Sequence, residues 1–334
     1  MFKRFRGMLE DVGLIEHIPG YYQHDKLGGP GGYQTLFRPT QSLIDLAEAH
    51  GVTLEDLPEH FAGERLAVPA SQDLLVLKGR KPPRNGIVRG QGPTLSIPQG
   101  DEGAARLLAE LEDLNAYLSA APIEGFAFSG LRRIFNNGDD PAFRWQWGGR
   151  YYPIPGGDNY VKWKGGKATR AASIRLYNEH VGEVDLSASH LTVLHGLMGE
   201  PFDGAEDPYG PPGRSRDRMK RWITYALGRG SVRPMKGNWF AKVREEALAR
   251  HPLLDRYEAS GLTTLDLQFH EAEIIKDAMR RLREAEGVAV LPVFDSLVTP
   301  LSKLEAAAGH LKAAVSSYFP GVALTARVHV SGLS

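Results

Sequence analysis

Apolar positions follow two spacings along the chain, helical periodicity in some segments and short continuous runs in others. Helical spacing is strongest over 101–118, where leucines share one face, and it recurs over 38–50, 216–227, 241–249, 265–284 and 302–319. Continuous apolar runs predict strands over 74–78, from 181 to about 186 and over 322–330, and two more within 288–300. This mixture predicts an α+β fold in which helices cover one side of a small sheet.

The first third of the chain differs from the rest. Residues 1 to about 36 are rich in Gly, Tyr and Pro, and we expect them to form an irregular arm. The helix at 38–50 stops at Gly51, and Thr53 starts a capping-box-like pattern for a second short helix. A DNA-binding helix-turn-helix has this form, although a plain helical hairpin is the favoured interpretation. We expect a small, mostly helical domain over 1–120 and a second domain over 121–334.

Two aspartates stand at the ends of expected strands. Asp185 follows the apolar strand that starts at Val181, just before a helix that Ser187 could cap, and Asp295 lies where two apolar strands meet. A buried carboxylate is costly unless a cation meets it, so these positions favour a metal, an arginine or a lysine as partner. For Asp185 alone, helix capping is the simpler interpretation. As a pair, the aspartates could hold two Mg²⁺ (or Mn²⁺) ions about 4 Å apart.

Composition narrows the class of protein. The 334 residues include no cysteine, which excludes disulfides, thiolate metal sites and thiol nucleophiles. No apolar run approaches the roughly 18 residues of a membrane span, and no export signal follows the first residues. We therefore expect a cytoplasmic protein with no membrane partner. The 40 basic and 40 acidic residues balance, which argues mildly against a protein that coats nucleic acid generically.

Basic residues nevertheless concentrate in two segments. Between Arg214 and Arg244 the only acidic residue is Asp217, and from Arg144 to Arg175 the basic residues are interleaved with Trp and Tyr. Lys and Arg neutralise phosphates while aromatic rings stack on bases, so both segments favour a nucleic-acid-binding surface. A solvated basic face is the alternative.

Within the first of these segments, Arg216 and Lys220 are four residues apart, so they share one helix face and could hold a triphosphate. The order of Asp185, then Arg216 and Lys220, then Phe294-Asp295-Ser296 resembles motifs A, B and C of the single-subunit polymerases. These are the family A DNA polymerases and the phage-type RNA polymerases. The resemblance covers roughly residues 125 to 334.

Two more segments carry the resemblance. The run from Leu267 to Met279 is similar to the family A helix with Gln, an acid, Ile-Ile-Lys and Ala-Met at the same offsets, and Gly149-Arg150 resembles the family's Thr-Gly-Arg. The resemblance implies a polymerase palm, which is an antiparallel sheet with helices, and helical fingers, preceded by the small mostly helical N-terminal domain.

The resemblance also implies roles for residues of this chain. Asp185 and Asp295 would be the metal ligands, with Mg²⁺ or Mn²⁺ as the cofactor. Arg216 and Lys220 would contact the incoming (d)NTP, and Lys220 could protonate the departing pyrophosphate. His190 falls where family A DNA polymerases carry a Glu against the sugar, and its bulk favours deoxynucleotides.

Further roles concern the bases and the primer-template. The family's Tyr near the end of motif B falls at Gly228, so Tyr225 or Trp222 would have to stack on the nucleotide. Contacts to a nucleic acid primer-template are expected from Gln268, Arg150, Arg170 and Arg175. Phe294 replaces the family's motif C histidine, and no exonuclease-like carboxylate cluster precedes motif A.

The implied activity is attack of a primer 3′-hydroxyl on the α-phosphate of a (d)NTP, catalysed by a compact DNA polymerase without proofreading. Three alternatives stay open from the sequence. A primase-like or RNA polymerase would use NTPs, and a non-catalytic replication factor would retain only the scaffold. A mononuclear hydrolase site would use Asp185 with His180, His190 and His195, but the two last histidines are five apart and do not share a helix face cleanly.

Overall fold

The computed structural model describes residues 2–18, 21–24, 30–33, 36–53, 74–81, 92–211, 213–233 and 238–331. The chain divides into two compact units, Met1–Arg65 and Leu66–Ser334. Among the described residues, no helix is both long enough and apolar enough to cross a membrane.

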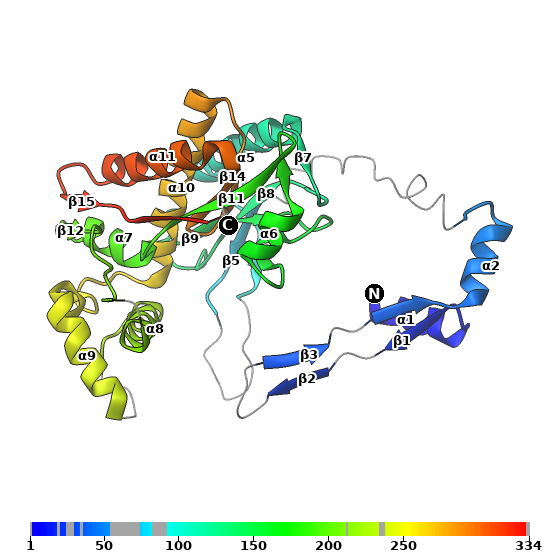
Figure 1. Cartoon of the computed structure of the whole chain (residues 1–334), viewed down its shortest axis with the longest axis horizontal. Coiled ribbons are helices and arrows are strands. Elements are labelled where there is room, and N and C mark those ends of the chain that lie inside the picture. The colour runs from blue at the N-terminus through cyan, green and yellow to red at the C-terminus, as the bar shows by residue number, and fades with distance from the viewer. Residues whose placement is uncertain are drawn as a thin grey trace. The chain divides into compact units, whose positions relative to one another are not determined.

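The first unit contains paired strands where the sequence suggested an irregular arm (Figure 1). Helix α1 (Phe2–Asp11) precedes β1 (Ile15–Ile18), which pairs antiparallel with β4 (Leu36–Pro39). Between them, β2 (Tyr21–His24) pairs with β3 (Pro30–Tyr33). Helix α2 (Gln41–Ala49) follows, as expected. The second helix proposed from Thr53 onward, and with it the helix-turn-helix, lies outside the described residues.

The second unit contains a six-stranded sheet in which every pairing is antiparallel. Its order is β13-β14-β11-β10-β7, and β16 also pairs with β11. The strands are β7 (Ile123–Glu124), β10 (Arg175–Leu176), β11 (Glu179–Leu186), β13 (Leu291–Val293), β14 (Ser296–Pro300) and β16 (Val328–Ser331). The expected strands before Asp185 and on both sides of Asp295 are confirmed.

Most helices expected from apolar spacing are present in this unit, with slightly different ends. They are α5 (Glu102–Ala120), α8 (Arg214–Arg229), α9 (Asn238–Arg250), α10 (Thr264–Glu286) and α11 (Leu304–Tyr318). Shorter elements are α6 (Lys167–Ser173), α7 (Ser189–Leu197), η1 (Tyr160–Lys162), η2 (Pro252–Arg256) and η3 (Leu301–Lys303). The final expected strand divides into β15 (Leu324–Thr325), which pairs with β12 (Phe202–Asp203), and β16.

Helices cover both faces of the six-stranded sheet, not one. Successive residues of a strand point to opposite faces. On β11, Gly182 lies against Leu304 of α11, whereas Glu183 binds Arg170 of α6. Helix α10 packs along α11 (Figure 1). The expectation of a sheet covered on one side is therefore corrected by α6, whose short sequence lacks a clear apolar stripe.

A second sheet brings residues before 120 into the same unit. Its order is β6-β5-β8-β9, built from β5 (Leu75–Lys78), β6 (Thr94–Leu95), β8 (Leu131–Phe135) and β9 (Gly148–Pro153). Strand β5 runs parallel to β8, and α5 packs on both. The Asp101 carboxylate caps α5 and accepts a hydrogen bond from the Trp145 indole at 3.0 Å. The division near residue 65 therefore replaces the boundary expected near 120.

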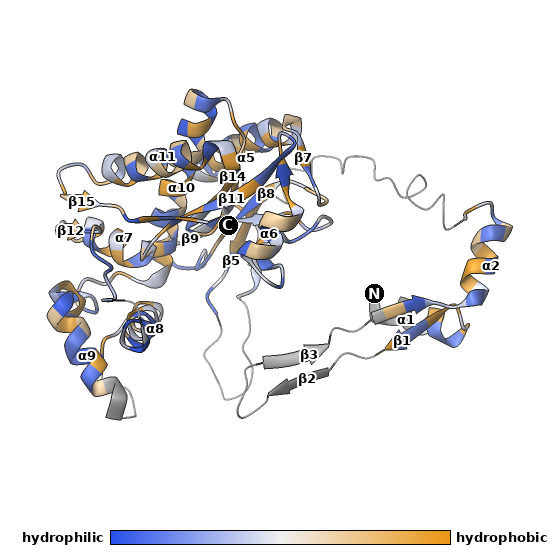
Figure 2. Cartoon of the chain, in the orientation of Figure 1, coloured by the Kyte–Doolittle hydropathy of each residue, from blue (hydrophilic) through white to orange (hydrophobic). Residues whose placement is uncertain are grey.

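Helix α8 shows how one element serves both the core and the surface. Its buried side chains are Met219, Trp222, Ile223, Ala226 and Leu227. Its ribbon is largely hydrophilic in Figure 2, because the basic residues occupy the remaining face. Trp222 is 1% exposed and belongs to the core, so it cannot stack on a nucleotide as considered above.

Candidate active site

Asp185 and Asp295 lie beside each other on neighbouring strands. Asp185 pairs with Ser296 of β14, and the backbone N–H of Leu186 donates to the carbonyl oxygen of Asp295 at 2.9 Å. Asp295 therefore occupies the turn next to the end of β11. The antiparallel register brings together two carboxylates that are far apart in the sequence.

The turn that carries Asp295 is short and strained. Val293 pairs with Ser296, so Phe294 and Asp295 alone form the turn, and Phe294 has a φ of 55°. This left-handed conformation is uncommon for a bulky residue. The Phe294 ring lies 5.1 Å from the Arg150 guanidinium and 5.9 Å from the Tyr152 ring. Packing against β9 thus holds the turn in a conformation that costs of order 1–3 kcal/mol.

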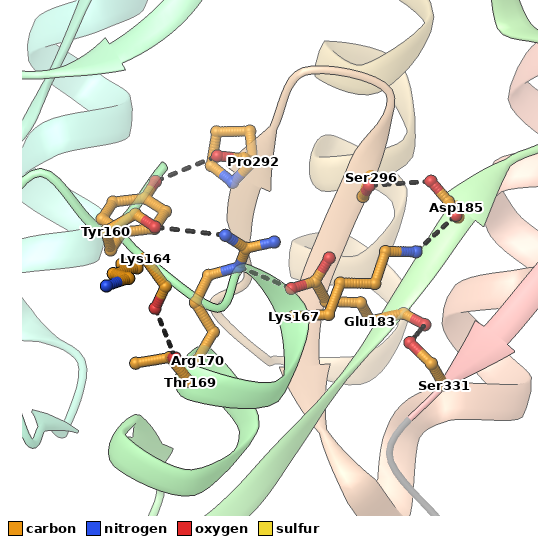
Figure 3. A network of polar contacts seen from close by, with 10 residues as sticks. All are labelled: Tyr160, Lys164, Lys167, Thr169, Arg170, Glu183, Asp185, Pro292, Ser296 and Ser331. Carbon is orange, nitrogen blue, oxygen red and sulfur yellow. Dashed lines mark hydrogen bonds and ion pairs between the residues drawn. The ribbon is translucent and has the colours of Figure 1, made fainter. Parts of the chain in front are cut away.

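Each carboxylate oxygen of Asp185 has a partner. The Ser296 hydroxyl donates to Oδ1 at 3.0 Å, and the Lys167 ammonium of α6 forms an ion pair with Oδ2 (Figure 3). Lys167 is partly exposed, so this ion pair is accessible to solvent. The structure therefore provides Asp185 with the cationic neighbour that its sequence environment required.

Asp295 has a different electrostatic environment. Burial, together with the nearby carboxylates of Glu271 and Asp185, raises the pKa of Asp295 to about 7. Arg150 acts in the opposite direction but does not cancel the increase. Such a concentration of negative charge favours a bound cation over an ionised, uncompensated carboxylate.

Both aspartates line a pocket of about 580 Å³ whose other side comes from α8. Arg216 and Lys220 line this pocket, so four of the residues expected to act together do share one cavity. The Arg216 Nε donates to Asp207 Oδ2 at 2.9 Å, and its guanidinium lies 5.6 Å from the Tyr209 ring. Lys220 is exposed and makes no hydrogen bond or ion pair with any described residue.

Glu271 is a carboxylate that sequence reasoning did not single out. It is 1% exposed on α10, and three side chains converge on it. The Ser189 hydroxyl donates to Oε2 at 2.5 Å, Arg150 Nε donates to Oε1 at 2.7 Å, and His190 Nε2 lies 3.5 Å from Oε2. Glu271 is three residues after Gln268 and shares its helix face, and this spacing could have identified it as a site residue from the sequence.

His190 lines the same pocket, as the sugar-contact expectation requires. Burial lowers the pKa of His190, the Glu271 carboxylate opposes this shift, and the Arg150 guanidinium adds to it. Arg150 Nη2 lies 2.9 Å from His190 Nε2. Because guanidinium only donates, Nε2 accepts this hydrogen bond, which corresponds to a neutral imidazole with its proton on Nδ1.

The remaining expected nucleic-acid contacts divide into three groups. Arg150 lines both the carboxylate pocket and a neighbouring groove, and Gln268 lines that groove. Tyr225 is 53% exposed and lies outside the pocket, although it shares a shallow depression with Lys220. Arg175 is exposed on β10, which pairs with the opposite end of β11 from Asp185.

Arg170 requires a correction. Its side chain is almost fully buried, its Nε donates to Glu183 Oε1 at 2.5 Å, and its Nη1 donates to the Tyr160 carbonyl oxygen at 3.2 Å (Figure 3). The guanidinium neutralises a buried carboxylate inside the fold and is not available to a nucleic acid. The sequence showed the charge of Arg170 but not its partner.

The histidine hydrolase site is not formed. His180 is exposed at the far end of β11, whereas His195 is 8% exposed and packs 4.7 Å from the Phe202 ring. Among the residues that the structure describes, no group of three or more His, Cys, Asp or Glu side chains is arranged to hold a metal ion. His195 is a core histidine.

The pair of Asp185 and Asp295 fits a divalent cation in one specific way. Mg²⁺ prefers oxygen ligands and is commonly held by one or two carboxylates together with water and substrate phosphates. Two aspartates beside an open pocket supply the protein share of such a set. The raised pKa of Asp295 reflects burial first and then the negative charge of neighbouring carboxylates, which a cation would offset. The donor set fits an ion whose coordination is completed by a phosphate-bearing substrate.

Comparison with known proteins finds similarity to solved structures, but not to family models or curated sequences. No protein-family model matches the sequence, and no curated protein matches it. The POL domain of Pol1 from M. smegmatis, in a complex with DNA primer-template and dNTP, aligns with a TM-score of 0.39 at 14% sequence identity. The alignment covers 68% of this chain and 51% of that chain, so this chain spans about half the length of that structure.

Proposed function

We propose that this protein is a template-directed nucleotidyltransferase, a compact DNA polymerase that extends a primer with deoxynucleotides. One observation carries the proposal. Asp185 and Asp295 form one side of a pocket in which Arg216 and Lys220 form another. A carboxylate pair facing a pair of cations is the arrangement needed to hold a nucleoside triphosphate with its divalent ions.

The cationic side of the pocket binds the triphosphate. Lys220 has no protein partner among the described residues, so its ammonium is free to meet a phosphate oxygen and to give a proton to the departing pyrophosphate. Arg216 is oriented by Asp207 and presents its remaining N–H groups to the same pocket. Tyr225, five residues further along α8, lines a shallow depression together with Lys220 outside that pocket.

The carboxylate side holds the reacting oxygen atoms in place. Asp185 and Asp295 would hold Mg²⁺ or Mn²⁺, which supplies activation of the primer hydroxyl and stabilisation of the leaving pyrophosphate. Lys167 and Ser296 fix the orientation of the Asp185 carboxylate. Arg150 and Gln268 contact the primer-template at the boundary between the pocket and the neighbouring groove.

His190 is the proposed sugar contact and favours deoxynucleotides. Its ring is fixed by Arg150 and packed beside Glu271, so it cannot move aside easily for a 2′-hydroxyl. In a primase-like enzyme that uses NTPs, His190 would instead form a hydrogen bond with that hydroxyl. The neutral ring carries its remaining proton on Nδ1. Comparing the use of dNTPs with that of NTPs therefore tests the role of His190 directly.

The test is extension of a labelled primer-template with Mg²⁺, run in parallel with dNTPs and NTPs, with a lane lacking primer and Asp295→Asn as the blank. The proposal expects extension with dNTPs that disappears in the Asp295→Asn protein. Products from NTPs without a primer would assign a primase instead. Binding of the duplex with no incorporation under any condition would leave a non-catalytic nucleic-acid-binding protein and refute the enzyme.

A further inference from the structure

A groove of about 990 Å³ adjoins the carboxylate pocket. Its floor is formed by the β6-β5-β8-β9 sheet, and its sides include the first turn of α10 and the end of η1. Pockets for single small ligands have volumes of roughly 300–1,000 Å³, so this groove lies at the upper end of that range and is large enough for a nucleotide unit of a longer strand. Arg150 lines both cavities and therefore marks the point where they meet.

The charge of the groove is one-sided. Its basic residues are Lys78, Lys81, Arg132, Arg150 and Lys162, and none of the described residues that line it is acidic. Lys81 and Lys162 are exposed, and neither forms an ion pair with a described residue. In a chain with equal numbers of basic and acidic residues, this is a local concentration that attracts a polyanion.

The surface between these cations is apolar and hydrogen-bonding. Leu95, Ile97 and Ile134 lie in it together with the Tyr152 ring. The side chains of Asn136, Asn159 and Gln268 add amide groups. A single strand exposes base faces as well as phosphates, whereas a duplex stacks its bases inside and presents mainly its backbone. The mixed lining therefore matches a single strand better than a duplex.

We propose that this groove binds single-stranded nucleic acid, with Lys81 and Lys162 contacting phosphates and the apolar floor contacting bases. The identity of the bound strand rests on the proposed function: it is the template, which passes Arg150 to reach the carboxylate pocket. Lys78 and Lys81 come from a part of the chain that the polymerase resemblance does not cover. The segment around β5 and β6 thereby gains a role in substrate binding.

The test measures binding without catalysis. A fluorescein-labelled 12-nucleotide oligo(dT) and a hairpin duplex are titrated by anisotropy in EDTA and without nucleotides, at several salt concentrations. The variant is Lys81→Gln with Lys162→Gln. The matched control is Arg106→Gln with Lys312→Gln, which removes two exposed charges from α5 and α11.

Each phosphate contact to a single strand contributes about 0.7 to the slope of log K against log salt, which is roughly 5-fold in affinity at 0.1 M. The groove variant should therefore bind oligo(dT) about 20-fold more weakly, with a slope smaller by about 1.4. The control variant should bind like the unmodified protein. Equal affinities and slopes for both variants would overturn the groove assignment, as would a loss confined to the hairpin duplex.

These outcomes are independent of whether the protein is an enzyme. If primers are never extended but oligo(dT) binding depends on Lys81 and Lys162, the proposed function fails and the groove remains. If primers are extended and both variants bind oligo(dT) equally, the groove assignment fails and the enzyme remains.

Discussion

The Arg150 guanidinium lies 2.6 Å from the Glu271 carboxylate, and this ion pair joins β9 to α10. Glu271 is 1% exposed, so its charge depends on the Arg150 guanidinium and on the hydrogen bond from the Ser189 hydroxyl for compensation. The same guanidinium packs on Phe294 beside the proposed metal ligand Asp295. Glu271 thus positions groups on β9 and α7 around the carboxylate pocket without itself being required to touch substrate.

We expect Glu271→Gln to lower both stability and activity. Removing one charge of a buried pair costs roughly 3–5 kcal/mol, and the partial exposure of Arg150 reduces this to about 2–3 kcal/mol. Loss of the restraint on Arg150 and His190 should reduce incorporation by at least about tenfold, because small displacements of positioning residues are costly. Urea unfolding gives the first quantity, and incorporation per folded molecule gives the second.

Glu273→Gln is the matched control for this prediction. Glu273 lies on the same helix and pairs with the buried Arg133 at 2.8 Å, but it does not line the carboxylate pocket. Its variant should lose stability while keeping the incorporation rate of the folded protein. Equal incorporation rates in the two variants would contradict a positioning role for Glu271.

Asp295→Asn should stabilise the fold, most strongly at high pH. A carboxyl whose folded pKa is raised contributes stability that is lost as pH rises through the folded pKa. Here that stability is lost between the ordinary aspartate pKa of 3.8 and the folded pKa of about 7. Asparagine does not titrate, so the variant should gain roughly 2 kcal/mol more at pH 8 than at pH 5.

Thermal melts with and without Mg²⁺ check this prediction. A divalent cation that binds the folded wild-type protein stabilises it, and this gain should be much smaller in Asp295→Asn. A variant that is less stable than the wild type at pH 8 in EDTA would show that the carboxylate is not repelled by its neighbours.

Lys220→Ala should mainly impair the use of nucleotide. The Lys220 ammonium has no partner among the described residues, so its removal should leave the fold intact. The substitution removes one positive charge that would contact the triphosphate. We expect kcat/KM for dNTP to fall about 100-fold, the usual size of losing one preorganised electrostatic contact. Arg218→Ala removes an exposed cation from the same helix that does not line the pocket, and it should stay within about 2-fold. Comparable losses in both variants would indicate a general charge effect.

His195→Leu should reduce the sensitivity of the fold to acid. Burial, together with the neighbouring His251, lowers the pKa of His195 to about 4. A histidine whose pKa is lowered by folding contributes its full stability above its unfolded pKa of 6.5 and loses that contribution as pH falls toward its folded pKa of about 4. Between pH 7 and pH 5, the wild type should lose about 2 kcal/mol that the variant keeps. If the free energies of unfolding of the wild type and of His195→Leu changed with pH in parallel, the lowered pKa of His195 would be refuted.

The sequence predicted elements well where periodicity was strong and one face was buried. The leucine pattern gave α5 almost to the residue, and the apolar runs on both sides of Asp295 gave β13 and β14. The meeting of Asp185 and Asp295 came from the order of motifs, because spacing alone says nothing about which strands pair. The register between β11 and β14 supplies that information only in the folded protein.

Other features depended on contacts between distant segments. Nothing in the local sequence of Arg170 indicates that Glu183 will bury it, and nothing around Lys167 indicates that Asp185 will be its partner. Glycine-rich and proline-rich sequence near the N-terminus weakened the strand signal, so β2 and β3 were missed. The boundary near 120 was misplaced because β5 joins a sheet whose other strands lie later in the chain.

The pairing of β11 on both edges carries a consequence for how the protein can fail. From Glu183 to Asp185 this strand is held by β14 on one side and β16 on the other. A slip by one residue would move Glu183 and Asp185 to the face that packs on α11, and Val184 to the face that now carries the two carboxylates. Two partners would have to slip together for that error to persist. A mispaired chain would therefore lose the approach of Asp185 to Asp295 and the close packing of the sheet together, because the same hydrogen bonds fix both.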